Sequence, residues 1–293
     1  MMEMIPKEIP YRDKSEFLRG FLLLIRQDKK ISKYERNMTL VIGKYFGFDE
    51  VKILNGGFSM WKKKNYLTEN KISMLPNFII IDFDSTFISK ESLDELASYA
   101  LQRSKSKDLI LDQIHQLTDD GMSGKITFYE SINSRLKLIS ATKEDVKFVS
   151  NNLKAHVTGS FKRNKYFINE HSDKIYIISG GFKEMLIPVL TSFGIPKKNI
   201  FGNDFIYDGE EIISFDSENP LTKVDGKAQV IESLSLNGEI HAIGDGYNDY
   251  QLKAAGSVTK FFAFTENIYR KEVCVLADKI IGSLDEYIDC VNE

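Results

Sequence analysis

The chain has 293 residues, a length typical of one or two domains, and its 39 basic and 42 acidic residues give a net charge of −3. Hydrophobic residues make up 42% and charged residues 28%, which is ordinary for a globular protein and excludes a largely disordered or collagen-like chain. The balanced charge provides no general attraction to nucleic acid or to an anionic membrane, so neither is expected as a partner.

The sequence predicts a cytoplasmic protein without membrane spans. No apolar run approaches the roughly 20 residues that a transmembrane helix needs, and the N-terminus lacks the pattern of a secretory signal. The two cysteines, Cys274 and Cys290, indicate a reducing compartment rather than a disulfide framework. The four histidines are scattered and no C-x-x-C motif occurs, which argues against a zinc site.

Residues 1–75 are expected to form an N-terminal extension. Amphipathic spacing predicts helices at Glu16–Gln27 and Tyr34–Phe46, followed by a short strand and a Gly-Gly turn within Val51–Trp61.

Residues 76–293 alternate short apolar runs with amphipathic segments, which is typical of a parallel α/β sheet. The first predicted strand, Phe78–Asp82, is a continuous apolar run ending in an acid, as expected for a strand buried on both faces. Further strands are predicted at Lys174–Ser179, Glu239–Asp245 and Phe261–Phe264. Helices are predicted at Phe182–Phe193 (ended by Gly194), Lys227–Leu234 and Asp249–Ala255, and a hairpin at Phe205–Phe215 around Asp208-Gly209.

One interval between predicted strands is far longer than a crossover requires. It contains 91 residues between Asp82 and Lys174, whereas a crossover needs only about a dozen. Helical spacing fills most of it, at Glu91–Leu101, Leu109–Leu117, Phe128–Leu138 and Lys143–Leu153. We therefore expect a small helical domain, residues 90–165, inserted after the first strand.

Polar residues follow three of the predicted strands at their carboxyl ends. These are Asp82-Phe-Asp84, Ser179-Gly180-Gly181 and Gly244–Asp249, with Lys227 just before the third strand. Because the carboxyl ends of parallel strands share one crevice, the fold should gather several carboxylates, a lysine and a Ser-Gly-Gly turn.

These groups suit a reaction at phosphate. Clustered carboxylates need a hard cation, and oxygen ligands that leave positions for water and phosphate favour Mg²⁺. The Ser-Gly-Gly turn and the lysine offer donors and positive charge to an anion. One carboxylate can attack phosphorus while another acts as general acid and then base. Each motif alone is more often a turn, a cap or a solvated lysine, and their joint order favours phosphoryl chemistry.

In the same order, these motifs resemble the four motifs of the haloacid dehalogenase superfamily: Asp82-x-Asp84-x-Thr86, Ser179, Lys227 and Gly244-Asp-Gly-x-Asn-Asp249. The resemblance covers Asn77 to the C-terminus and implies a Rossmann-like parallel sheet flanked by helices, with a helical cap inserted after the first strand. Within the superfamily the chain most resembles the phosphoserine phosphatases, on D-F-D-S-T, the following Glu91, and an M-x-G-x-x-x-F pattern followed by Arg135.

This resemblance implies a role for each motif residue. Asp82 would be the nucleophile that forms an aspartyl-phosphate, and Asp84 the general acid and base, with Lys227 completing the catalytic set. The ligands of Mg²⁺ would be Asp82, Asp84, Asp245 and Asp249. The phosphate would be bound by Ser179, Gly180, Lys227 and Asn248.

The resemblance also implies a substrate, O-phospho-L-serine, whose hydrolysis gives serine and phosphate as the last step of serine biosynthesis. Glu91 would face its ammonium group and Arg135 its carboxylate, while Met122 and Phe128 would close over it. A guanidinium suits this task because it binds a carboxylate through two parallel hydrogen bonds. Taken alone, Glu91 is more often a helix N-terminal acid and Arg135 a surface arginine.

Residues 54–61, preceded by Gly47-Phe48, resemble the end of a rhodanese domain. The expected position of the thiolate nucleophile is occupied by Ile31, and this region contains no cysteine. We interpret the stretch as a degenerate remnant that serves structure, docking to a protein partner or self-association, without sulfur transfer.

Other functions stay open on the sequence. The same site could act on another small phosphomonoester, such as phosphocholine or phosphoethanolamine, or transfer the phosphoryl group to another alcohol. A non-catalytic phosphoamino-acid sensor and a docking module are the alternatives from other classes. Arg135 favours a substrate with a carboxylate, and the intact Asp82/Asp84 pair favours an enzyme.

Overall fold

The computed structural model describes residues 75–292. The elements predicted at Glu16–Gln27, Tyr34–Phe46 and Val51–Trp61, and the rhodanese-like stretch, lie outside the described residues. Among the described residues, no helix combines the length and the apolar character needed to span a bilayer.

A six-stranded parallel sheet forms the centre of the described part, in the order β3-β2-β1-β6-β7-β8. Its strands are β1 (Phe78–Ile81), β2 (Ile175–Phe182), β3 (Ile200–Asn203), β6 (Ile240–Gly244), β7 (Lys260–Phe264) and β8 (Lys279–Ile281). The strand order reverses at β1, because β2 and β3 lie on one side of it and β6 to β8 on the other. Such a reversal opens a crevice at the carboxyl ends of the strands. The predicted α/β fold class is confirmed.

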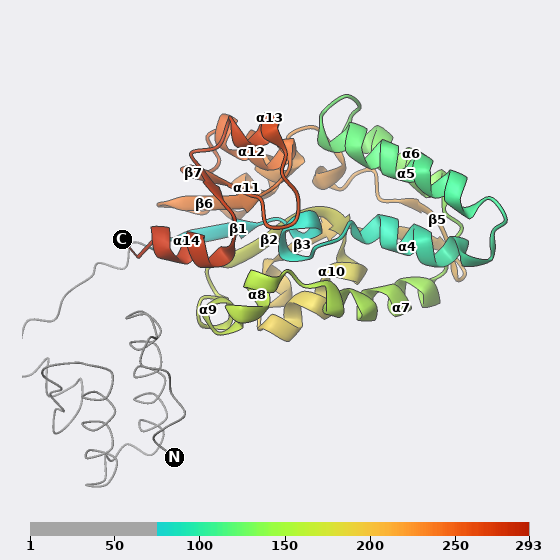
Figure 1. Ribbon diagram of the computed structural model, residues 1–293, viewed down its shortest axis with the longest axis horizontal. Helices are drawn as coiled ribbons and strands as arrows, with labels where there is room; N and C mark the ends of the chain where they lie inside the picture. The colour runs from blue at the N-terminus through green and yellow to red at the C-terminus, as the bar shows by residue number, and fades with distance from the viewer. Residues whose placement is uncertain (1–74, 293) are drawn as a thin grey trace, which may run out of the picture. The chain divides into compact units, whose positions relative to one another are not determined.

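Helices cover both faces of this sheet (Figure 1). One face packs against α11 (Gly226–Leu234), α12 (Tyr247–Ala254) and α13 (Lys271–Cys274). The other packs against α8 (Gly159–Arg163), α9 (Lys165–Glu170), α10 (Lys183–Leu190) and α14 (Leu284–Cys290). Side chains alternate between the faces along each strand, so Ile79 and Ile81 enter one core cluster and Ile80 the other. Burial on both faces explains the continuous apolar runs in the sequence.

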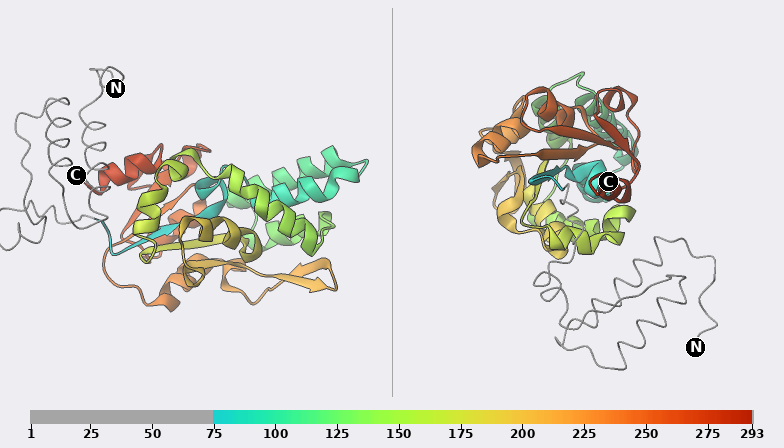
Figure 2. Two further views of the ribbon diagram at one scale, coloured as in Figure 1. Left: turned by 90° about the horizontal axis from the view of Figure 1, so that it is seen from below. Right: turned by 90° about the vertical axis from the view of Figure 1, so that its left-hand side faces the viewer.

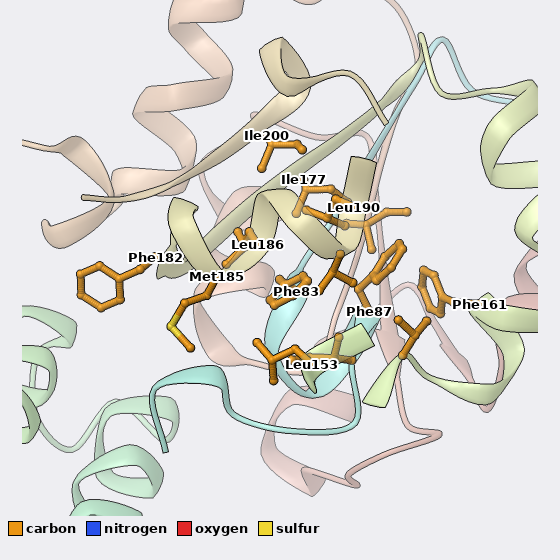
Figure 3. Close-up of a cluster of buried hydrophobic side chains, with 14 of the residues drawn as sticks. Phe83, Phe87, Leu153, Phe161, Ile177, Phe182, Met185, Leu186, Leu190 and Ile200 are labelled. Atoms are coloured by element: carbon orange, nitrogen blue, oxygen red, sulfur yellow. The ribbon is translucent and has the colours of Figure 1, made fainter. Parts of the chain in front are cut away.

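Aromatic packing fixes the segment that follows β1 (Figure 3). The ring of Phe87 lies 4.7 Å from that of Phe161 and 5.2 Å from that of Phe193, measured between centroids. Phe83 and Phe87 are both fully buried, in the same cluster as Leu190 of α10. Large buried rings contribute strongly to stability, so the short turn after β1 is firmly anchored.

The interval between β1 and β2 begins with the helices α4 (Ser92–Ala100), α5 (Lys107–Met122), α6 (Phe128–Leu138) and α7 (Lys143–Leu153), and α8 and α9 follow them before β2 (Figure 1). Helices α6 and α7 begin with capping boxes, Thr127 with Glu130 and Thr142 with Asp145. The chain segments that enter and leave these four helices meet in a bridge between Ile88 and Val157.

The predicted hairpin is confirmed as β4 (Phe205–Asp208) and β5 (Glu211–Phe215), an antiparallel pair whose turn contains Gly209 with φ of +56°. It reaches the turn between α6 and α7 (Figure 2, left). There Ile212 donates its N–H to the carbonyl of Ala141 at 2.9 Å, and Lys143 donates to the carbonyl of Glu210 at 2.9 Å. The hairpin thus connects the sheet region to the helical insertion.

The structure differs from the sequence prediction mainly in short elements. Strands β3 and β8 were not predicted, because runs of three or four residues carry too little periodicity. Helices α8, α9, α13 and α14 were missed for the same reason, since each has four to seven residues. The predicted helix at Leu109–Leu117 is the middle of the longer α5, and the second strand continues beyond Ser179 to Phe182.

Candidate active site

The site is built on a sharp turn after β1. Asp82 follows the strand directly, and its N–H donates to the carbonyl of Ile243 at 3.0 Å, which extends the pairing with β6. Asp84 keeps an extended conformation, whereas Ser85 has φ of +54°, in the left-handed region that few side chains occupy. The turn therefore places both carboxylates at the carboxyl edge of the sheet before the chain enters α4.

Three buried carboxylates meet at this edge, from Asp82, Asp245 and Asp249, with ligand oxygens all within 4.8 Å of one another. Lys227 lies against two of them: its Nζ donates to Asp82 Oδ1 at 2.7 Å and to Asp249 Oδ1 at 2.6 Å. Asp245 is held separately, by Thr86 Oγ1 at 2.9 Å and by Arg270 Nε at 3.1 Å.

The ionisation of this cluster follows from burial and from like charge. Burial raises the pKa of Asp82 well above its usual value, the Asp249 carboxylate raises it further, and Lys227 offsets only part of the increase. Burial and Asp249 likewise raise the pKa of Asp245. Burial alone would lower the pKa of Lys227, but Asp249 and Asp82 raise it above its ordinary value. An all-oxygen donor set with excess negative charge fits a hard divalent cation such as Mg²⁺.

Asp84 has a different environment from Asp82. Both of its oxygens accept hydrogen bonds from the first residue of α4, from the Ser92 N–H at 2.8 Å and from Ser92 Oγ at 3.0 Å. Burial raises the pKa of Asp84 to about 6, and the bonds from Ser92 moderate that increase. A carboxyl group that titrates near neutrality can both donate and accept a proton, which is what general acid–base catalysis requires.

The Ser-Gly-Gly turn lies at the carboxyl end of β2, the strand next to β1. Ser179 Oγ accepts a hydrogen bond from the Gly181 N–H at 2.9 Å, and Gly180 lies against the Cζ end of the Phe128 ring at the start of α6. A Cβ atom on Gly180 would come within 2.1 Å of Phe128 Cζ, so only glycine allows this approach. Asn203 Nδ2 donates to the Gly180 carbonyl at 2.7 Å and fixes the orientation of that peptide.

A cavity of about 320 Å³ lies between these strand ends and the helices α5 and α6. Eleven of the twelve site residues predicted from the sequence line it: Asp82, Asp84, Glu91, Met122, Phe128, Arg135, Ser179, Gly180, Lys227, Asn248 and Asp249. The twelfth, Asp245, does not line it and belongs to the adjoining carboxylate cluster. The helical insertion places Met122 beside Gly246, where a Cβ would lie 3.5 Å from the sulfur.

Glu91 and Arg135, which the resemblance assigns to the ammonium and the carboxylate of the substrate, are both held by hydrogen bonds. Glu91 Oε1 accepts a hydrogen bond from Ser85 Oγ at 2.6 Å, and burial together with Asp84 raises the pKa of Glu91. Arg135 is only 6% exposed, and its Nη1 donates to Thr118 Oγ1 at 2.8 Å and to Asp94 Oδ1 at 3.2 Å. Its Nε is buried without a hydrogen-bond partner among the described residues.

Several residues that shape the site were not predicted from the sequence. Arg270 pairs with Asp245 from a stretch between β7 and α13 that shows no periodicity. Asn267 donates from Nδ2 to the carbonyl of Ser85 at 3.0 Å and to Thr158 Oγ1 at 2.7 Å, so it supports the strained turn. Asp94 and Thr118 looked like ordinary polar helix positions, because their burial arises only when α4, α5 and α6 pack together.

A profile of haloacid dehalogenase-like hydrolases matches residues 79–253. The chain belongs to this family. The prediction made from the motifs is thereby confirmed, and the matched span begins in β1 and ends in α12, so it contains all four motifs.

Similarity to individual proteins and to a solved structure supports the same family. A phosphoserine phosphatase of Drosophila melanogaster is 31% identical over 208 residues, which cover 69% of this chain and 73% of that protein. A phosphoserine phosphatase of Homo sapiens is 29% identical over 220 residues, covering 73% of this chain and 92% of the relative. The crystal structure of a phosphoserine phosphohydrolase-like protein from Francisella tularensis has a TM-score of 0.66 and 34% identity, and the match covers 73% of this chain and 99% of that one.

Proposed function

We propose that this haloacid dehalogenase-like hydrolase is a Mg²⁺-dependent phosphatase that hydrolyses O-phospho-L-serine to L-serine and phosphate, as the last step of serine biosynthesis. One observation carries the proposal. A single cavity is lined at one end by the carboxylates and Lys227, which suit a phosphate and its metal, and elsewhere by Glu91 and the buried Arg135. These last two side chains match the ammonium and the carboxylate of the substrate.

Asp82 is proposed as the nucleophile. Its carboxylate oxygen attacks phosphorus, the bond to the serine oxygen breaks, and an aspartyl-phosphate forms. Asp84 has a pKa of about 6, so part of the population is protonated near pH 7. The protonated Asp84 gives its proton to the departing serine oxygen. It then takes a proton from the water molecule that attacks the aspartyl-phosphate, and phosphate is released.

The remaining polar groups bind and orient the phosphate. Lys227 bridges Asp82 and Asp249, so its ammonium lies where it can neutralise a phosphate oxygen beside the nucleophile. Ser179, the Gly180 backbone and Asn248 line the same cavity and supply further donors. Mg²⁺ would be held by Asp82, Asp245 and Asp249 with the Asp84 carbonyl, and when bound it would offset the charge of the carboxylates and the phosphate.

The ionisation of Glu91 should depend on whether the bound substrate carries an ammonium group. Burial and the nearby Asp84 raise the pKa of Glu91, so its neutral form is favoured in the empty cavity. An ammonium group placed beside it favours the ionised form, so a substrate with a free amine gains an ion pair there. A phosphomonoester without an ammonium group gains no such pair.

We also propose that the helical insertion, residues 90–165, acts as a cap over the 76–293 core, and that residues 1–75 are an extension available for a protein partner or for self-association. The contact of Phe128 with Gly180 and the position of Met122 beside Gly246 support a cap that excludes water from the phosphate end. Exclusion of water protects the aspartyl-phosphate until Asp84 activates one molecule.

The test is phosphate release from O-phospho-L-serine, with Mg²⁺ and with EDTA, for the full chain and for Asp82→Asn. Phosphocholine and phosphoethanolamine serve as comparison substrates. Release that needs Mg²⁺, prefers phosphoserine and disappears in Asp82→Asn is the expected result.

Two other outcomes would contradict the proposal. Activity on phosphocholine or phosphoethanolamine without activity on phosphoserine would keep the reaction class and reject the substrate. No release from any ester by folded protein would favour a phosphoamino-acid sensor or a docking module instead.

A further inference from the structure

Arg135 is held by a network that joins three helices of the insertion. Asp94 on α4, Thr118 on α5 and Arg135 on α6 are all buried. Thr118 Oγ1 lies 3.0 and 3.1 Å from the two carboxylate oxygens of Asp94 and accepts a hydrogen bond from Arg135 Nη1 at 2.8 Å. Arg135 Nη1 also donates to Asp94 Oδ1 at 3.2 Å.

The network engages one corner of the guanidinium and leaves its Nε–Nη2 edge without hydrogen bonds among the described residues. Nη1 carries both contacts, whereas Nε is buried and unpartnered and no hydrogen bond joins Nη2 to the described residues. A buried donor without an acceptor is costly, and Arg135 lines the cavity. The Nε–Nη2 edge has the spacing that receives a carboxylate through two parallel hydrogen bonds.

We propose that Asp94 and Thr118 are positioning residues that determine selectivity for a substrate carboxylate by fixing the Arg135 guanidinium with its Nε–Nη2 edge free. The inference rests on the proposed function, since it concerns the same cavity. Asp94 and Thr118 do not line the cavity themselves, so they act through Arg135 rather than on the substrate. They should therefore affect the binding of the carboxylate much more than the chemistry at phosphorus.

The pair of substrates that isolates this effect is O-phospho-L-serine and phosphoethanolamine, which differ only by the carboxylate. In Asp94→Asn we expect the KM for phosphoserine to rise at least about 10-fold with kcat within about 3-fold. The KM for phosphoethanolamine should stay within about 2-fold, because that substrate does not use the guanidinium edge. Thr118→Val should also raise the KM for phosphoserine, but by less than Asp94→Asn does. Thr118→Ser keeps the hydroxyl and should retain the wild-type preference for phosphoserine.

Asp112→Asn is the matched control, because Asp112 is an exposed acid on α5 and does not line the cavity. It should leave both KM values unchanged. Thermal unfolding of each variant shows whether the helices remain packed, and the Thr118 pair decides the question if Asp94→Asn does not fold.

The outcomes separate this inference from the proposed function. A wild-type enzyme that does not prefer phosphoserine over phosphoethanolamine overturns both. A wild-type preference that persists unchanged in Asp94→Asn and Thr118→Val overturns the positioning role alone. An equal loss on both substrates would assign the network a purely structural role and would also reject it.

Discussion

The two walls of the cavity hold their charges in different ways. On the sheet side, Asp82 and Asp245, which belongs to the carboxylate cluster beside the cavity, follow neighbouring strands, and the hydrogen-bonded ladder of β1 and β6 sets the spacing between them. On the helical side, the guanidinium of Arg135, which projects from α6, is held by side-chain hydrogen bonds with Asp94 and Thr118 from two other helices.

In the proposed reaction, the backbone ladder on the sheet side and the side-chain network on the helical side suit different tasks. Strand ends joined by backbone hydrogen bonds provide fixed positions, which suit a phosphoryl transfer that tolerates little misplacement of the reacting atoms. A network of side chains can be changed by single substitutions without disturbing the sheet. The chemical step should therefore depend on the sheet wall, and substrate choice on the helical wall.

The largest expected effect falls on the sheet wall. Lys227→Met removes the cation between Asp82 and Asp249, and we expect phosphate release from every phosphomonoester to fall about 1,000-fold. Steady-state kinetics with Mg²⁺ measures this loss. Lys223→Met is the matched control, because Lys223 also lines the cavity but pairs with the exposed Glu218 at 3.5 Å. Equal losses in the two variants would contradict the special position of Lys227.

Stability should show the same contrast between the two regions. Phe87→Ala empties a fully buried site between Phe161 and Phe193, and we expect the free energy of unfolding to drop by about 3 kcal/mol. Phe148 on α7 is 46% exposed and stacks on Tyr99 at 4.3 Å, so Phe148→Ala should cost less than about 1 kcal/mol. Urea unfolding of both variants decides whether the turn after β1 is the more firmly packed region.

The contact where the two walls meet can be tested with a double mutant. Gly180→Ala places a methyl group against Phe128, so the ring must move away, and kcat/KM for phosphoserine should fall about 10- to 100-fold. Phe128→Leu creates space, so Gly180→Ala should cost less in that background than in the wild type. Additive losses in the double-mutant cycle would mean that Gly180 serves the phosphate alone and not the contact with the helical insertion.

The smallest expected effect concerns the interior of the sheet. His241 on β6 is buried, with its Nδ1 3.1 Å from Tyr287 Oη and its Nε2 2.9 Å from Glu239 Oε1. Burial lowers the pKa of His241, and Glu239 offsets only part of that effect. The unfolded chain therefore binds this proton more readily than the native state, and stability should decrease as the pH falls from about 7 to about 5.

Urea unfolding across that pH range measures the decrease, which should be at most about 1 kcal/mol. His241→Asn has no group that titrates there, so the difference between its curve and that of the wild type isolates the histidine. A histidine that instead stabilised the fold at low pH would give the opposite slope.

The sequence predicted the parts of this molecule that have strong local patterns. The continuous run at Phe78–Ile81 identified β1, and the acids after it identified the carboxyl edge of the sheet, because burial and strand direction leave clear traces in sequence. The hairpin was predictable from Asp208-Gly209, since Gly209 adopts a positive φ. Strand β8, with three residues at the edge of the sheet, left no such trace.

Contacts between distant segments were not predictable from local patterns. Arg270 reaches Asp245 across 25 positions of sequence, and Asp94 meets Arg135 across 41. Neither pair follows from a period of 2 or 3.6 residues, because each depends on how separate elements pack. The resemblance supplied a role for Arg135, whereas the partners that orient its guanidinium emerged only from the arrangement of α4, α5 and α6.

The bridge between Ile88 and Val157 has a consequence for the evolution of this fold. The chain enters and leaves helices α4 to α7 at adjacent points, where the Ser89 N–H donates to the His156 carbonyl at 2.8 Å and the Thr158 N–H to the Phe87 carbonyl at 3.0 Å. An insertion of another length or shape can begin and end at the same two points without altering the register of β1 or β2. Substrate range can thus diversify by replacement of a whole module while the catalytic edge of the sheet is inherited intact.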